Sequence, residues 1–154
     1  MKKIKIYADG ACSPNPGVGG YGAMLVYQDQ SKDMSKGFIN TTNNRMELLG
    51  IIDPLESLKE ACEVHIVTDS QYVANSINQN WIEGWIKRGW KTAAKKPVKN
   101  QDLWNRMVHM MNKHTITIEW VRGHAEHPEN THCDGLAVVA RMGSNLVEDE
   151  GYDG

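Results

Sequence analysis

The sequence predicts an α/β fold with a five-stranded mixed sheet, in which three antiparallel strands are followed by parallel crossovers and helices flank the sheet. Apolar residues recur at strand-like spacing through most of residues 4–40. The apolar spacing then becomes helical from residue 42. Two short apolar runs, 64–68 and 116–120, lie between the helical segments. The expected order is therefore β-β-β-α-β-α-α-α-β-α.

The first three strands are predicted from alternation and from the turns that separate them. Apolar and polar residues alternate over 4–8. The segment 10–22 is rich in Gly and Pro, which favours a tight turn region. Further strands are expected at about 20–28 and 34–40, with a hairpin turn at 29–32 between them.

The first helix is predicted by apolar residues at helical spacing: Leu48, Ile51, Ile52, Leu55 and Leu58. Thr42 or Asn43 is the expected N-cap. Proline inside a helix removes a hydrogen bond and clashes with the preceding turn, at a cost of about 3 kcal/mol. Pro54 therefore predicts a kink or an early end of this helix near Asp53.

The later elements alternate between helices and strands. They are expected in the order strand 64–68, helix 70–79, Trp- and Lys-rich helix 81–89, helix around 103–110, strand 116–120 and helix 131–141. The segment of about 146–154 is acidic, and we expect it to be a flexible tail. Together these elements make one domain that spans residues 1–154.

Composition indicates a single domain with its own hydrophobic core. The chain has 154 residues, 40% of them hydrophobic, and a net charge of −2, so any nucleic-acid contact must rely on a local basic surface. Three widely spaced cysteines, Cys12, Cys62 and Cys133, argue against a disulfide framework or a zinc site. Neither a signal peptide nor a membrane-length apolar run is evident, so we expect a cytoplasmic protein with no membrane partner. Nothing in the sequence suggests an obligate dimer, so we also expect a monomer.

Four carboxylates stand at predicted ends of strands or near starts of helices: Asp9, Glu47, Asp69 and Asp134. Such positions on neighbouring elements can meet at one edge of a sheet. Four acids that meet there repel one another unless cations hold them, and a pair of Mg²⁺ or Mn²⁺ ions is the natural occupant. Two such ions commonly serve phosphodiester cleavage. Taken singly, Asp9 is as well explained by a turn and Asp69 by a helix cap.

Polar residues beside the acids suggest further roles. Asn43 and Asn44 precede Glu47, where they could cap the helix or contact sugar and base edges. His124 follows Gly123 in a loop between the last strand and Asp134. A histidine there can move a proton at neutral pH, although a lone His is more often structural.

Residues 81–100 form a basic segment on a slightly acidic chain. Its cations, against the single acid Glu83, are Lys87, Arg88, Lys91, Lys95, Lys96 and Lys99, and its tryptophans are Trp81, Trp85 and Trp90. The charges could simply be solvated, and the tryptophans could pack in the core. A local basic ridge is also what contact with a phosphate backbone requires.

Several motifs in one order carry a resemblance to a known family. They are Asp9-Gly10-Ala11-Cys12, Asn15-Pro16-Gly17, Asn44-Arg45-Met46-Glu47, Asp69-Ser70-Gln71-Tyr72, Trp90-Lys91-Thr92, Lys96-Pro97-Val98-Lys99-Asn100, and Gly123-His124 with Asn130 and Asp134. From Ile4 to about Tyr152, the chain resembles ribonuclease H of the bacterial type 1 class. The basic segment 81–100 resembles the basic handle of that family, and we use that name for it below.

The resemblance implies a ribonuclease H-like fold and an endonuclease that hydrolyses the RNA strand of an RNA–DNA hybrid, leaving 5′-phosphate and 3′-hydroxyl ends. It implies that Asp9, Glu47, Asp69 and Asp134 bind two Mg²⁺ ions, with Mn²⁺ as a possible substitute. One ion would activate the attacking water and the other would stabilise the leaving 3′ oxygen. His124 would assist proton movement or product release.

The resemblance also implies a set of substrate contacts. Residues expected near the minor groove, where RNA 2′-hydroxyls are recognised, are Cys12, Asn15, Asn43, Asn44 and Gln71. Thr42 and Asn100 match a pocket for a phosphate of the DNA strand. Residues of the basic handle expected along the DNA backbone are Trp81, Lys87, Arg88, Lys95, Lys96 and Lys99.

Three residues near the expected site residues are unfavourable for helix stability or add negative charge. Pro54 disturbs the helix that carries Glu47, and Gly135, with a helix propensity about 1 kcal/mol poorer than alanine, follows Asp134. Glu126 adds negative charge near His124, which favours a raised histidine pKa. We therefore hypothesise an active enzyme of low thermal stability.

Three alternatives stay open at this point. One is a nuclease of the same fold that cuts duplex DNA. Another is a module that binds hybrids without cutting them, although clustered acids would not help such a protein to bind phosphates. The third is a structural domain whose acids are accidental.

Overall fold

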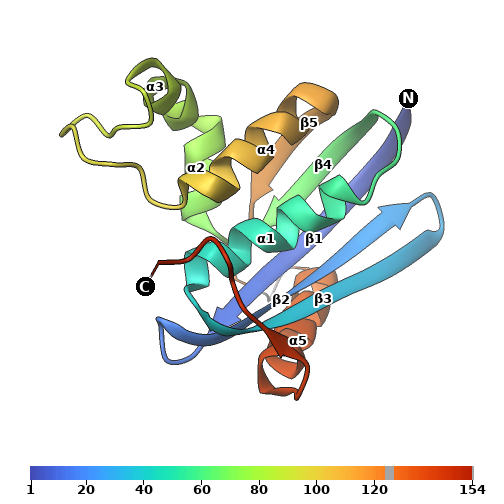
Figure 1. Ribbon diagram of the computed structural model, residues 1–154. Helices are drawn as coiled ribbons and strands as arrows, with labels where there is room; N and C mark the ends of the chain where they lie inside the picture. The colour runs from blue at the N-terminus through green and yellow to red at the C-terminus, as the bar shows by residue number, and fades with distance from the viewer. Residues whose placement is uncertain (124–126, 154) are drawn as a thin grey trace.

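The computed structural model describes residues 1–123 and 127–153 and contains a mixed sheet with helices on both faces (Figure 1). The strands are β1 (Lys2–Cys12), β2 (Gly17–Tyr27), β3 (Gln30–Thr41), β4 (Cys62–Thr68), β5 (Thr115–Trp120) and β6 (Leu146–Val147). The helices are α1 (Asn43–Glu56), α2 (Gln71–Asn78), α3 (Trp81–Lys87), α4 (Gln101–Lys113) and α5 (Pro128–Met142).

The sheet confirms the predicted α/β fold class. Its strand order is β5-β4-β1-β2-β3-β6. The neighbours β1, β2 and β3 pair antiparallel, whereas β4 pairs parallel with both β1 and β5. The short β6 adds a sixth strand, parallel to β3, that the sequence analysis did not predict.

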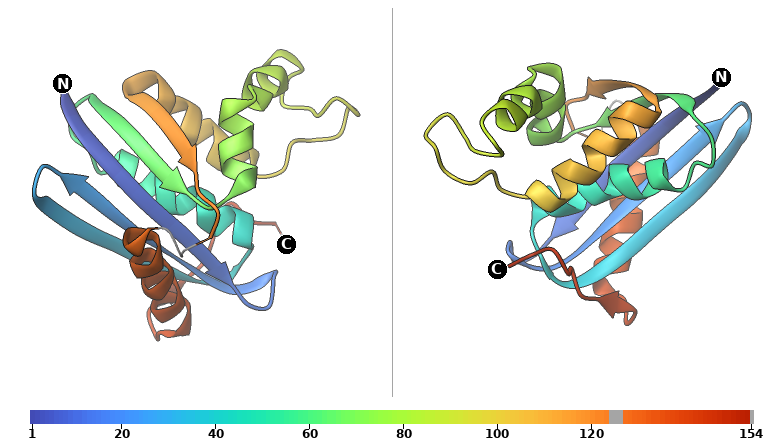
Figure 2. Two further views of the ribbon diagram at one scale, coloured as in Figure 1. Left: turned by 180° about the vertical axis from the view of Figure 1, so that it is seen from behind. Right: turned by 45° about the horizontal axis from the view of Figure 1, so that its top comes forward.

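The helices lie in two layers around this sheet. α1 packs on β1 and β2 from one side, with α4 beside it, and α5 crosses β1, β2 and β3 on the opposite side (Figure 2). The main core lies under α1, where Met46, Leu48, Ile51 and Ile52 are fully buried against strand residues such as Ile6. The start of α1 is therefore held firmly above the middle of the sheet.

The Gly- and Pro-rich segment 10–22 is mostly strand rather than turn. β1 runs on to Cys12 and pairs with β2 as far as Gly19, so only residues 13–16 connect the two strands. The glycines serve close packing: a Cβ on Gly22 would lie 2.3 Å from the carbonyl oxygen of Cys133 in α5. The expectation of a tight turn region over 10–22 was wrong for all but residues 13–16, because glycine permits close approach as well as turns.

The first helix does not end near Asp53, as Pro54 had predicted. α1 continues to Glu56, and the backbone N–H of Ser57 donates to the carbonyl of Asp53 at 3.1 Å. Pro54 lacks the N–H that would donate to the carbonyl of Gly50, but only Leu55 and Glu56 follow it in the helix, so the loss is confined to the end of α1.

Part of the C-terminal segment, which its composition predicts to be a flexible tail, contacts the domain in the structure. Leu146 and Val147 pair with β3, and the side chain of Asp149 is 5% exposed because it meets Arg45. The burial of one carboxylate against a cation holds this acidic segment on the domain.

None of the helices among the described residues combines the length and apolarity needed to cross a bilayer.

Candidate active site

Asp9, Glu47 and Asp69 meet at one edge of the sheet, as their sequence contexts predicted. One carboxylate oxygen from each lies within 4.8 Å of the others. Asp9 is not at the end of its strand, however. β1 continues beyond it beside β2, and it is the pairing with β4 that stops at Tyr7 and Val67. Asp69 follows β4 at that point, so the two carboxylates become neighbours.

Glu47 joins this pair because the start of α1 rests directly on β1. A Cβ built on Gly10 would lie 2.7 Å from the backbone nitrogen of Glu47 and 2.9 Å from the carbonyl carbon of Met46. Only a glycine at position 10 allows such an approach. The residue next to Asp9 therefore sets the distance between the helix and the strand.

Asp134 lies inside α5 on the other side of the sheet edge. It is not one of the three most closely spaced acids, but its charge and a hydrogen bond act on Asp9. The thiol of Cys133 donates to the carbonyl oxygen of Tyr7 at 3.3 Å, which anchors α5 on β1 one residue before Asp134. The structure thus brings all four predicted acids to one place.

Burial and mutual repulsion raise the pKa values of Asp9 and Glu47. Burial, followed by the charges of Asp69 and Asp134, raises the pKa of Asp9 to about 8. Burial, followed by the charge of Asp9, raises the pKa of Glu47 well above its usual range. The buried Glu47 Oε2 has no hydrogen-bond donor among the described residues. A buried oxygen without a donor, in a cluster of acids that repel one another, fits a hard divalent cation, which supplies the missing positive charge.

Asp69 is not the cap of the following helix. The hydroxyl of Ser70 accepts from the backbone N–H of Val73 at 3.2 Å and caps α2. The indole Nε1 of Trp120 donates to the carbonyl of Asp69 at 3.0 Å. The cap explanation for Asp69 is therefore wrong, and its carboxylate faces the other acids.

Six of the predicted contacts to the substrate line one groove of about 1020 Å³, which includes the start of the helix that carries Glu47. Residues from the prediction that line it are Asn15, Thr42, Asn43, Asn44, Lys99 and Asn100. Thr42 is the N-cap of α1, since its hydroxyl accepts from the backbone N–H of Arg45 at 3.2 Å. The Asn15 amide oxygen accepts from the backbone N–H of Asn43 at 3.1 Å and ties the β1–β2 connection to the helix.

The other seven predicted contacts do not line this groove: five belong to the basic handle, and Cys12 and Gln71 lie elsewhere. Gln71 is exposed at the first residue of α2, two positions after Asp69. The thiol of Cys12 donates to the carbonyl of Pro14 at 3.2 Å and lies near those of Gly17 and Thr41. Both residues flank the cluster of acids, and their roles remain predictions.

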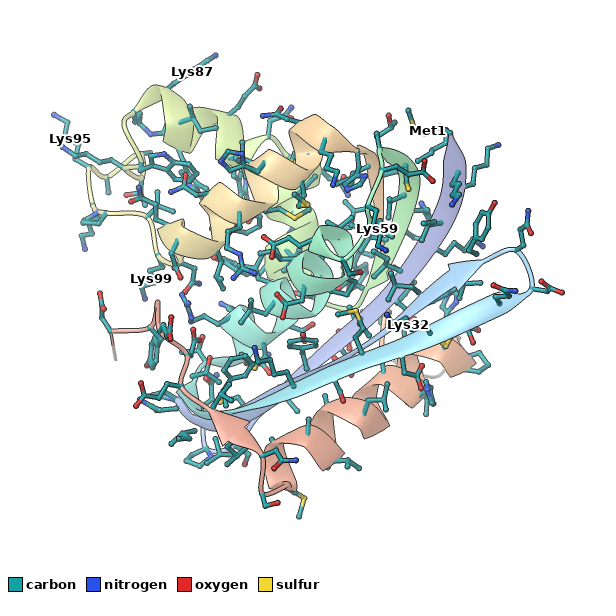
Figure 3. The ribbon with its side chains drawn as sticks, turned by 45° about the vertical axis from the view of Figure 1, so that its right-hand side comes forward. Met1, Lys32, Lys59, Lys87, Lys95 and Lys99 are labelled. Carbon is teal, nitrogen blue, oxygen red and sulfur yellow. The ribbon has the colours of Figure 1, made fainter. Side chains whose placement is uncertain are left out.

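The basic handle divides into a packed part and an exposed part. Trp85 packs edge-on against Trp104 with ring centroids 5.7 Å apart, whereas Trp81 is 39% exposed. Figure 3 shows Lys87 and Lys95 projecting from the rim of the molecule, with Lys99 nearer the C-terminal segment. The remaining predicted cations of the handle, Arg88 and Lys96, are also exposed. The packing interpretation thus holds for Trp85, and contact of the exposed cations with a phosphate backbone stays a prediction.

His124 and Glu126 lie outside the described residues. The proton-transfer role of His124 and the effect of Glu126 on its pKa therefore stay predictions.

Sequence reasoning missed the environment of Arg45, whose side chain is 2% exposed. It bonds with Asp102 and Asp149 beneath the groove. The available signal was a cation in the first turn of an otherwise apolar helix, but nothing local identified its partners.

Comparison with known proteins assigns the chain to one group. The sequence profile of the family described as RNase H matches residues 1–142. A protein named Ribonuclease H from Pseudoalteromonas atlantica is 54% identical over 154 residues and covers 100% of both chains. A Ribonuclease H from Escherichia coli is 57% identical over 152 residues, which is 99% of this chain and 97% of that one.

Solved structures agree with this fold. LC9-RNase H1, described as a type 1 RNase H with the type 2 active-site motif, is 29% identical and superposes with a TM-score of 0.81 over 99% of this chain and 80% of that chain. LC11-RNase H1, solved in complex with an RNA/DNA hybrid, is 21% identical with a TM-score of 0.62 over 89% of this chain and 95% of that chain. The second likeness, at this identity, shows the fold alone.

Proposed function

The chain belongs to the ribonuclease H family, whose activity is cleavage of RNA in RNA–DNA hybrids, and we propose that it is a metal-dependent endonuclease that hydrolyses the RNA strand to leave 5′-phosphate and 3′-hydroxyl ends. The observation that carries this proposal is the set of three acids within 4.8 Å of one another, two of them with raised pKa values. Repulsion among these carboxylates destabilises the folded protein unless bound cations offset it.

In this proposal Asp9, Glu47, Asp69 and Asp134 hold two Mg²⁺ ions, which Mn²⁺ could replace. When bound, the pair of ions would supply the charge that activates the attacking water and stabilises the leaving 3′ oxygen. Asp9 is the central ligand because it is hydrogen-bonded or close to each of the other three acids. Ion binding requires the acids to be deprotonated, so it would compete with protons at Asp9, whose pKa burial and neighbouring charge raise to about 8. His124 moves protons or assists product release.

The groove provides the contacts that select a hybrid. Asn15, Asn43 and Asn44, with Cys12 and Gln71 near the acids, would meet the minor groove, where RNA 2′-hydroxyls distinguish RNA from DNA. The geometry favours this assignment because amides donate to and accept from a hydroxyl equally well.

The DNA strand would lie along the other side of the groove. Thr42 and Asn100, which line the same groove, would hold one DNA phosphate. Trp81 and the handle cations Lys87, Arg88, Lys95, Lys96 and Lys99 would follow the DNA backbone by charge, so binding should weaken as salt rises. We further propose that the protein acts as a monomer in the cytoplasm.

The test is cleavage of an RNA–DNA hybrid labelled on each strand, with Mg²⁺ or with EDTA. Wild type is compared with Asp69→Asn and with Asp29→Asn, a matched change of an exposed residue in the β2–β3 turn. We expect wild type and Asp29→Asn to cut only the RNA strand, and EDTA or Asp69→Asn to abolish cutting. The downstream RNA fragments should accept a new 5′ label only after phosphatase treatment.

Other outcomes favour other functions. Cutting of duplex DNA but not of hybrid would indicate a DNA nuclease of the same fold. Tight binding of hybrid without metal-dependent cutting would indicate a binding module.

A further inference from the structure

Arg45, Asp102 and Asp149 form a buried ion cluster, which we call the Arg45 clasp. The guanidinium donates to Asp149 at 2.6 Å from Nε and 2.9 Å from Nη2. It also donates to Asp102 at 2.9 Å from Nη1 and 2.7 Å from Nη2. Both acids are therefore engaged bidentately, which is the strongest arrangement for arginine and carboxylates.

The clasp joins three segments that are far apart in the chain. Arg45 is in the first turn of α1, Asp102 is in the first turn of α4, and Asp149 belongs to the C-terminal segment. That segment crosses the start of α1 in Figure 1 and in the right-hand view of Figure 2. Asp149 also accepts from the hydroxyl of Thr41 at 2.8 Å, and the ring of Tyr152 lies 6.0 Å from the Arg45 guanidinium.

Charge balance makes the clasp dependent on each member. Burial alone would lower the pKa of Arg45, but the bonds to Asp102 and Asp149 raise it, so the cation persists. Burial would raise the pKa of Asp102, yet Arg45 holds it below its usual range. Because a buried guanidinium needs its partners, the loss of one carboxylate should shift the segment that carries it.

The clasp borders the residues proposed to hold a DNA phosphate. Asn100 is the N-cap of α4, and its amide oxygen accepts from Arg45 Nη1 at 3.4 Å while its amide nitrogen donates to the Tyr72 hydroxyl at 3.2 Å. Thr42 follows Thr41, which Asp149 binds, and accepts from the backbone N–H of Arg45. Thr42 and Asn100 thus stand on the two helices that the clasp joins.

We propose that the Arg45 clasp is a positioning device for the hybrid. By tying the C-terminal segment to the starts of α1 and α4, it fixes the spacing between Thr42 and Asn100, and thereby sets the affinity for the DNA strand. Arg45, Asp102 and Asp149 act through those two residues and do not take part in the chemistry at the four acids. This inference rests on the proposed function.

Simple electrostatics predicts the opposite effect of tail mutations. The C-terminal segment also lines the groove through Gly151, Tyr152 and Asp153, and its acids would repel phosphates. Removing a negative charge from it should then leave KM for the hybrid unchanged or lower it. The clasp predicts instead that removing the one acid bonded to Arg45 raises KM.

The experiment compares Asp149→Asn with Glu150→Gln in hybrid cleavage at saturating Mg²⁺. Glu150 is exposed and adjacent, so the two variants lose the same charge from the same segment. We expect Asp149→Asn to raise KM about fivefold, the effect of losing part of one charge-assisted contact, with kcat unchanged. Glu150→Gln should have a KM equal to or below that of wild type. Asp102→Asn, on the other arm of the clasp, should raise KM as Asp149→Asn does.

Separate measurement of kcat and KM distinguishes a variant that is merely destabilised from one whose phosphate contacts are displaced. A partly unfolded preparation lowers the apparent kcat and leaves KM unchanged, whereas a displaced pocket raises KM. A wild-type KM in both Asp149→Asn and Asp102→Asn would overturn the proposal, as would a loss confined to kcat.

Cleavage by wild type, together with binding of a fluorescent hybrid in EDTA, distinguishes failure of the proposed function from failure of the role proposed for the Arg45 clasp. If wild type cuts no hybrid under any condition, the proposed function fails. If wild type cuts, but Asp149→Asn binds hybrid as tightly as wild type does, only the clasp fails.

Discussion

Replacing Gly10 by alanine should separate two of the proposed metal ligands, Asp9 and Glu47, without touching either side chain. The new Cβ would lie 2.7 Å from the backbone nitrogen of Glu47, and ordinary contacts of such an atom begin at 3.4 Å. The difference requires the start of α1 to withdraw by about 0.7 Å. Glu47 would move with it, away from Asp9 and Asp69.

The size of the effect follows from that displacement. A misplacement of about 1 Å can cost roughly 100-fold in rate, so we expect kcat/KM for hybrid cleavage to fall by about 10- to 100-fold. Overpacking should cost about 1–3 kcal/mol, which lowers the melting temperature by roughly 2–12 °C for a domain of this size. Cleavage kinetics over a range of Mg²⁺ concentrations and thermal unfolding in EDTA measure the two effects.

Gly135→Ala is the matched control. A Cβ at Gly135 meets nothing within 4 Å, although the residue adjoins Asp134 inside α5. It should stabilise the protein by about 1 kcal/mol through helix propensity and leave kcat/KM unchanged. If Gly10→Ala cut hybrid and melted like wild type, the close packing of α1 on β1 would not be what positions Glu47.

Three further predictions concern stability. In EDTA, Asp9→Asn should melt higher than wild type, and with Mg²⁺ it should cut nothing. The folded state keeps a proton on Asp9 up to a pKa of about 8, against 3.8 ordinarily, so the stability of wild type falls between these pH values as pH rises, by on the order of 2 kcal/mol at pH 5.5. An equal or lower melting temperature of Asp9→Asn in EDTA would contradict this. Burial lowers the pKa of His114, whose Nδ1 accepts from the Cys62 backbone N–H at 3.0 Å. The contribution of His114 to the free energy of unfolding is therefore complete above pH 6.5 and is lost as pH falls below it. Between pH 7.5 and pH 5, the free energy of unfolding measured with denaturant should fall less in His114→Gln than in wild type. Ile52→Ala, at a fully buried position under α1, should lower the free energy of unfolding by about 2–5 kcal/mol in urea titrations, and a loss below 1 kcal/mol would mean that the core relaxes around the gap.

The sequence determined the parts of this protein that depend on short spacing. Alternation over 4–8 and helical spacing from Leu48 fix which face of each element is buried, and these periods act between residues a few positions apart. The acids Asp9 and Asp69 could be assigned to one sheet edge because each follows a run of residues with a strand-like apolar pattern, although β1 in fact continues past Asp9. Motifs of this kind are local, and so is the physical chemistry that makes them recognisable.

Where one residue type has two common structural roles, only the tertiary structure shows which role applies. Asp69 and Ser70 are equally good caps by residue type, and only the bond from Val73 shows that Ser70 caps α2. The glycines between 10 and 22 predicted turns because glycine's second use, close approach, is visible only when α1 and α5 are in place.

The raised pKa of Asp9 and the Arg45 clasp were decided by tertiary structure alone. The pKa depends on burial and on Asp69 and Asp134, whose distances are set by the packing of β4 and α5 on β1. Arg45 and Asp149 are 104 residues apart, and no short-range pattern selects that partner among the other acids. Electrostatic and hydrogen-bonding energies depend on distances across the folded chain, whereas the patterns a sequence displays report on neighbours along it.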